Sequence, residues 1–254
     1  MTRHVWILCC CLALACSSKD DSKTPSPKAP VKQQPTPTPV ETPPPARTKS
    51  PLSEHMQGHF AAISGIQAAV VDGELPKIKS VAAWLAEHSE HGDVAWKAEL
   101  EAVRATAKEL STVASLTKAT PLAARLAGQC GNCHVTMTTI TSFQWSPVPN
   151  DGPTVVHRML RHRWALKRLW EGLVGPSTTS WFEGTKILAA DALPVAKLAK
   201  ASANTAQVGK FASTLQGLAK RGQKADTHAA RTAIYGELLG TCAGCHKLTR
   251  KPKP

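Results

Sequence analysis

Two copies of the pattern Cys-x-x-Cys-His constrain this chain more than any other feature of its sequence. On a helix, residues three apart share a face, so both sulfurs of one copy can bond the two vinyl groups on one edge of a porphyrin. The histidine that follows can then bind the iron. The pattern therefore predicts two covalently attached haem c groups. The cysteines expected to carry them are Cys130, Cys133, Cys242 and Cys245, and the expected proximal iron ligands are His134 and His246.

Three other uses of these cysteines agree less well with the sequence. A zinc ribbon would place its two cysteine pairs much closer together than Cys133 and Cys242 are. A thioredoxin-like redox pair gives no reason for a histidine after each copy. A disulfide within a Cys-x-x-Cys pair closes a small loop and stabilises a fold little. Haem attachment accounts for both cysteines and for the histidine of each copy.

The first residues have the pattern of an export signal. A short positive start precedes a brief apolar stretch, residues 5–15, which is too short to span a membrane. Cys16 follows a small residue and precedes a polar segment, which resembles the cleavage site of bacterial lipoproteins. We therefore expect a signal peptide at 1–15, lipid on Cys16 and an extended Pro-rich tether at 16–53. An ordinary cleaved signal followed by a free thiol is the alternative.

The body of the chain is an internal repeat. Met56 and His59 precede the first haem motif, and Met159 and His162 precede the second in the same order. The repeats span residues 54–146 and 153–250, and a turn-rich segment joins them. This duplication predicts two similar haem-binding units.

Within each repeat, apolar residues spaced three and four apart predict helices. The expected helices span about residues 56–71, 75–88, 96–110 and 122–135 in the first repeat, and 153–173, 177–192, 203–220 and 227–247 in the second. Aromatic residues make up only 5% of the chain, which argues against a β-sandwich or barrel. Short connections make neighbouring helices antiparallel. We therefore expect an all-α fold of two tandem four-helix bundles, each with a haem motif on its last helix.

A four-helix bundle with the haem motif on its last helix resembles the cytochrome c prime family. Arg250 lies four residues after His246, as is common in that family, whereas no arginine follows His134 at this spacing. Two such repeats behind an export signal are similar to a tandem di-haem c-type cytochrome lipoprotein. Six-coordinate members of the family bind the far side of the iron with a Met of the first helix.

The start of the first helix should lie beside the end of the fourth, where the haem motif ends. Each repeat offers there a Met and a His on one helix face, and either side chain can bind iron. The candidate distal ligands are Met56 or His59 in the first repeat and Met159 or His162 in the second. The alternative is a five-coordinate iron against which the Met packs. Other histidines, among them His55 and His88, are expected at helix ends or polar faces and not on a metal.

Positive charge is concentrated in the second repeat. The chain has a formal net charge of +13, of which residues 150–254 carry +11, whereas residues 54–149 carry −2. Five cations lie along one expected helix: Arg158, Arg161, Arg163, Lys167 and Arg168. Such a surface favours an acidic redox partner protein or an anionic membrane surface, or it simply keeps the protein soluble. Nucleic acid is not expected for an exported protein.

The sequence shows no motif of a Ser/His/Asp catalytic triad and no glycine-rich phosphate-binding loop. We therefore expect an electron-transfer protein more than an enzyme: an exported di-haem cytochrome c, lipid-anchored on the periplasmic side of a bacterial membrane, inner or outer. One alternative is a five-coordinate haem protein that binds or senses nitric oxide or carbon monoxide. A di-haem peroxidase is the less favoured alternative.

Overall fold

The computed structural model describes residues 51–88, 95–139, 141–199 and 204–249, which belong to one compact unit. These residues form helices and connections, without strands, so the expected all-α class is confirmed. The helices are α1 (Pro51–Asp72), α2 (Leu75–Glu87), α3 (Lys97–Ser111), α4 (Leu116–Thr136), α5 (Val155–Val174), α6 (Thr178–Ala190), α7 (Val195–Ala199), α8 (Thr205–Gly222) and α9 (His228–Thr249). The expected signal peptide, Cys16 and most of the tether lie outside the described residues. No helix in the described ranges is both long and apolar enough to cross a membrane.

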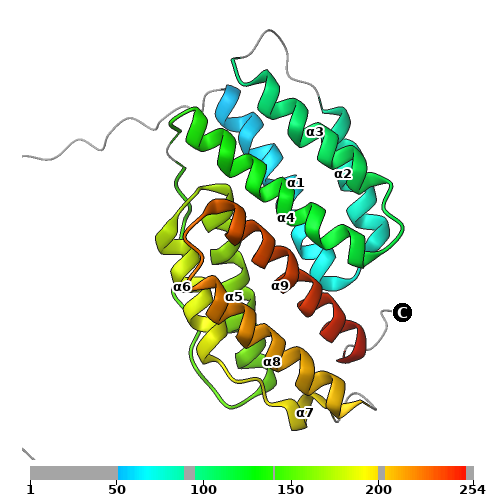
Figure 1. Cartoon of the computed structure of the whole chain (residues 1–254), viewed down its shortest axis with the longest axis vertical. Helices are drawn as coiled ribbons and strands as arrows, with labels where there is room; N and C mark the ends of the chain where they lie inside the picture. Colours follow the sequence, from blue (N-terminus) through cyan, green and yellow to red (C-terminus); the bar gives the residue numbers. More distant parts are fainter. Residues whose placement is uncertain (1–50, 89–94, 140, 200–203, 250–254) are drawn as a thin grey trace, which may run out of the picture. The chain divides into compact units, whose positions relative to one another are not determined.

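The helices pack in two sets that follow the repeats (Figure 1). In the first set, α1 packs on α2, α2 on α3, α3 on α4, and α4 back on α1. In the second set, α5 packs on α6, α6 on α8, α8 on α9, and α9 on α5, with the short α7 against α8. The two sets also contact each other, α4 against α9 and each of these against the first helix of the other set. Their buried residues form one continuous hydrophobic core.

Gly128 lets α4 and α9 approach closely, and the equivalent Gly240 makes the matching contact with the other helix. A Cβ atom on Gly128 would come within 2.7 Å of Thr232 Oγ1, and one on Gly240 within 3.5 Å of Thr120 Oγ1. Gly128 and Gly240 precede their Cys-x-x-Cys-His motifs by the same number of residues, and Thr120 and Thr232 are likewise equivalent. Because equivalent positions exchange contacts, the two repeats are related by an approximate two-fold rotation. In this arrangement α4 and α9 run antiparallel.

Two helices begin earlier than their spacing predicts. α1 begins at Pro51, within the expected tether, and α4 begins at Leu116 instead of near residue 122. Pro121 therefore lies inside α4 and has no N–H for the Thr117 carbonyl. The Thr120 hydroxyl donates to that carbonyl at 3.4 Å, so the carbonyl keeps a partner and the helix continues.

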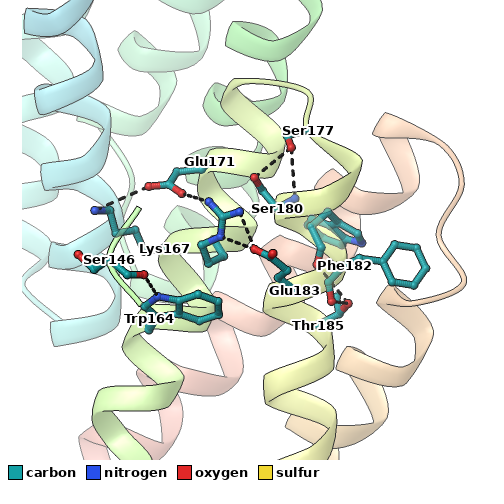
Figure 2. Close-up of polar contacts among 11 residues, drawn as sticks. Ser146, Trp164, Lys167, Glu171, Ser177, Ser180, Phe182, Glu183 and Thr185 are labelled. Atoms are coloured by element: carbon teal, nitrogen blue, oxygen red, sulfur yellow. Dashed lines mark hydrogen bonds and ion pairs between the residues drawn. The ribbon is translucent and has the colours of Figure 1, made fainter. Parts of the chain in front are cut away.

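Much of the expected basic surface on α5 is paired or buried. Arg168 has a side-chain exposure of 2% and lies 2.7 Å from Glu171, which is equally buried, and 2.7 Å from Glu183. Figure 2 shows these two carboxylates together with Lys167, which lies 3.7 Å from Glu171. Arg161, in turn, forms an ion pair with Asp191. Of the five cations expected to form a basic surface, Arg168 is buried and Arg161 is paired, whereas Arg163 and Lys167 are exposed.

The same buried arginine holds the connection between the two sets against α5. The guanidinium carbon of Arg168 lies 3.7 Å from the centre of the Trp145 ring, a cation–π contact. The indole N–H of Trp164 donates to the Ser146 carbonyl at 2.9 Å, and Figure 2 shows this bond beside the charge cluster. The connection is thus fixed by side chains of the second set.

Tyr235 of α9 joins three helices through its hydroxyl. The side chain is fully buried, accepts a hydrogen bond from Gln67 Nε2 of α1 at 2.7 Å and donates to the Leu166 carbonyl of α5 at 3.2 Å. Tyr235→Phe removes both bonds and leaves the Gln67 amide without this partner. We expect the free energy of unfolding to fall by about 1–3 kcal/mol, measured by urea denaturation. An unchanged unfolding midpoint would contradict these bonds.

Candidate functional site

The four motif cysteines lie in the last turns of two neighbouring helices. Cys130 and Cys133 are on α4, Cys242 and Cys245 are on α9, and all four are partly buried free thiols. Burial, with a smaller effect of the neighbouring Cys133, raises the pKa of Cys130 to about 12. Burial likewise raises the pKa of Cys242 to about 12. These thiols are neutral at pH 7. A thioredoxin-like redox pair needs the opposite shift, so this environment disfavours that alternative.

The two motif histidines make a matching pair of hydrogen bonds. His134 Nδ1 lies 2.7 Å from the carbonyl oxygen of Val174, and His246 Nδ1 lies 2.9 Å from that of Val71. A carbonyl only accepts, so Nδ1 carries the proton in both rings and the lone pair is on Nε2. This tautomer binds a metal through Nε2, while the carbonyl sets the orientation of the ring.

Both orienting carbonyls come from the other set of helices. Val174 ends α5 and Val71 lies near the end of α1, and the spacing that relates Met56 to Met159 also relates these two valines. Gly131, inside the first motif, permits this approach, because a Cβ there would overlap the Leu173 carbonyl oxygen. Each motif histidine is therefore positioned by the repeat that does not contain it.

The candidate distal ligands lie in the first turns of α1 and α5. Gly73, just after α1, lies close to Leu116 at the start of α4, so these helices run antiparallel and the start of α1 lies toward the Cys-x-x-Cys-His motif of α4. Met56 and His59 are partly buried there. In the second set, Met159 is partly buried, and His162 is 7% exposed. The directions of α1 and α4 therefore agree with the arrangement that a distal ligand on α1 requires.

The equivalent histidines His59 and His162 each have a buried Nε2 without a hydrogen-bond partner in the described part of the chain. Burial, together with smaller effects of the neighbouring His55 and His88, lowers the pKa of His59 to about 4. Burial also lowers the pKa of His162, although Asp191 opposes the shift. Both imidazoles are therefore neutral at pH 7 and have the charge state of a metal ligand.

The structure brings together three histidines that the sequence left apart. His55 and His88, expected at polar helix ends, lie beside His59, and ring nitrogens of all three fall within 4.8 Å of one another. His88 does lie at a helix end, directly after α2, but neither side chain is on an open polar face, since both are partly buried against His59. The sequence did indicate that His55 and His59 are neighbours, because they are one helical turn apart. The sequence could not predict that His88 joins them, because this contact depends on the packing of α2 on α1.

Comparisons with known proteins add no family to this description. No protein-family model, curated protein or solved structure matches the chain. The chemistry of the site is therefore argued from the donor set itself. Thiols, oriented imidazoles and buried imidazole nitrogens are groups that suit covalent haem c, since they include both the attachment atoms and the axial ligands.

Proposed function

We propose that this chain is an exported, membrane-anchored di-haem cytochrome c that carries single electrons between redox partners. The observation that carries the proposal is the paired placement of two Cys-x-x-Cys-His motifs at the ends of α4 and α9. In each motif, the histidine Nδ1 is bonded to a carbonyl, which makes Nε2 the ligand atom. In this proposal the two sets of helices are haem-binding four-helix bundles similar to those of the cytochrome c prime family.

The protein residues would bind and orient the cofactor. Cys130 and Cys133 would form thioethers in the first set, and Cys242 and Cys245 in the second. His134 and His246 would bind the irons from the proximal side, with ring orientations set by the carbonyls of Val174 and Val71. The haem supplies one-electron chemistry when bound, and the helices supply axial ligands and exclude water.

The distal ligands we propose differ between the sets. In the second set, the buried Nε2 of His162 makes this histidine the better candidate than Met159. In the first set, His59 belongs to a group of three histidines, so Met56 is the better candidate. In both sets the protein would supply a second ligand to the iron, which would suit electron transfer more than the binding of a gas.

The antiparallel register of α4 and α9 sets the separation of the two motifs. Gly128 lies beside Thr232 and Gly240 beside Thr120, so the motifs lie at opposite ends of this helix pair. With about 1.5 Å of rise per residue, Cys133 and Cys245 are about 27 Å apart along the helix axis. Electron tunnelling weakens steeply with distance, so we propose that each haem exchanges electrons with a partner at its own end. For the second set, an acidic redox protein is the partner class that the net charge of +11 on residues 150–254 favours.

The absorption spectrum of the purified, reduced protein tests this function. We expect two haems per chain by the pyridine haemochrome assay and the sharp bands of low-spin, six-coordinate iron. A protein without haem would end the proposal. A broad high-spin spectrum that shifts on addition of carbon monoxide would replace electron transfer with binding of a small gas.

A further inference from the structure

The three-histidine cluster (His55, His59, His88) has the dimensions of a metal site. His55 and His59 are one turn apart on α1, and His88 directly follows α2. The ring centres of His55 and His59 are 4.2 Å apart. The ring centre of His88 lies 5.1 Å from that of His55 and 5.3 Å from that of His59. Two imidazoles bound to one tetrahedral Zn²⁺ have ring centres about 5 Å apart. One ring nitrogen of each histidine lies within 4.8 Å of the other two, so the three side chains could hold one ion.

We propose that the three-histidine cluster binds a divalent transition-metal ion of the zinc class, at a site separate from both haems. Imidazole nitrogen is a preferred ligand of zinc, copper and nickel, and three histidines leave a fourth position for water or another small ligand. All three side chains are partly exposed, so an ion can enter from solvent. This site goes beyond the electron-transfer function and does not depend on it.

His88 is positioned before any ion binds. The Trp84 ring stacks on its imidazole, with ring centres 4.3 Å apart and planes at 27°. The Arg104 guanidinium donates to the His88 carbonyl at 2.7 Å and 3.2 Å, and the His88 N–H donates to the Trp84 carbonyl at 2.9 Å. Contacts of this kind orient metal ligands and raise the affinity of a site. The third ligand is therefore held in place although it lies outside a helix.

The charge of the cluster also suits a metal. Three histidines this close would repel one another if protonated, and the lowered pKa of His59 is the consequence of burial and of these neighbours. A neutral imidazole is the form that binds metal ions. The buried Nε2 of His59 has no hydrogen-bond partner in the described ranges, and a bound ion would satisfy it.

The second repeat serves as an internal comparison. At the positions equivalent to His55, His59 and His88 it has Arg158, His162 and Asp191. Arg158 Nη1 lies 3.3 Å from Asp191 Oδ1, so an ion pair fills the place where the first repeat has two histidines. The fold therefore does not require three histidines at these positions. Packing alone therefore does not explain the three histidines, because the second repeat packs the same helices with an ion pair at two of these positions.

Zinc titration of the full-length protein tests the proposal. The protein, free of any histidine tag, is treated with EDTA, dialysed and titrated with Zn²⁺, and iron and zinc per chain are measured by elemental mass spectrometry. We expect one zinc ion per chain that resists dialysis. His88→Ala and His59→Gln should each weaken zinc binding by more than about 100-fold, because loss of an outer partner alone weakens metal sites by about 10- to 100-fold.

The controls separate this site from other zinc ligands. His157→Ala removes a histidine outside the cluster and should leave zinc binding unchanged, and far-UV circular dichroism checks that each variant is folded. Absence of bound zinc in the unaltered protein would overturn the proposal, as would zinc binding that survives His88→Ala. A loss of the low-spin haem bands in His59→Gln would make His59 an iron ligand and would equally overturn it. Iron content is measured separately, so a protein that binds zinc but lacks haem refutes only the electron-transfer function.

Discussion

Replacing Cys242 and Cys245 by serine is expected to halve the covalently bound haem of the chain, from two groups to one. A serine hydroxyl forms no thioether, so the second haem loses its attachment to α9. The first set keeps Cys130 and Cys133, and the backbone carbonyl of Val174 that orients His134 is unchanged. The haem count is measured by the pyridine haemochrome assay, and the intact mass of the denatured protein shows how many haems remain attached.

The reciprocal variant is the matched control. Cys130→Ser with Cys133→Ser should also retain one covalent haem, carried by the second set. All four replacements together should abolish covalent haem while leaving the polypeptide mass otherwise intact. An unaltered haem count in either double variant would show that the motif cysteines do not carry the cofactor.

The second large effect is expected from Arg168→Leu, which should lower the free energy of unfolding by about 3–5 kcal/mol. The Arg168 and Glu171 side chains are each 2% exposed and lie 2.7 Å apart. Removing the guanidinium leaves the buried Glu171 carboxylate with only the exposed Lys167, 3.7 Å away, as an ion-pair partner. It also removes the cation that stacks on Trp145 and so loosens the connection between the sets. Urea denaturation followed by circular dichroism measures the change.

A second arginine–glutamate pair of the same repeat provides the comparison. Arg221 and Glu237 lie 2.9 Å apart, but both side chains are at least half exposed. Arg221→Leu should therefore leave the urea midpoint within experimental error, because solvent screens exposed ion pairs. Equal effects of the two substitutions would show that burial does not make Arg168 important.

Local structure could be predicted because the signals that determine it are short-range. The spacing of apolar residues predicted the helices, and caps such as Ser115 and Ser177, whose hydroxyls accept backbone N–H groups, mark where two of them begin. The predicted start of α4 was wrong because a proline usually indicates that a helix begins or ends near it. The Thr120 side chain compensates for Pro121, and spacing alone does not show such a bond.

Long-range contacts could not be predicted in this way. The residues joined by the His134–Val174 bond are 40 positions apart, and those of the His246–Val71 bond are 175 apart. His88 meets His55 only because α2 packs antiparallel on α1. The charge of Arg168 indicated solvent exposure, yet two carboxylates compensate for its burial.

The all-α class, the internal repeat and the two Cys-x-x-Cys-His motifs were determined by the sequence alone, because periodicity and motif spacing act within a few turns of one helix. Which partner each of those residues meets was decided by the tertiary structure. Contacts between helices depend on the register in which they cross. Here that register follows from close approaches such as Gly128 against Thr232, which join residues far apart in the chain.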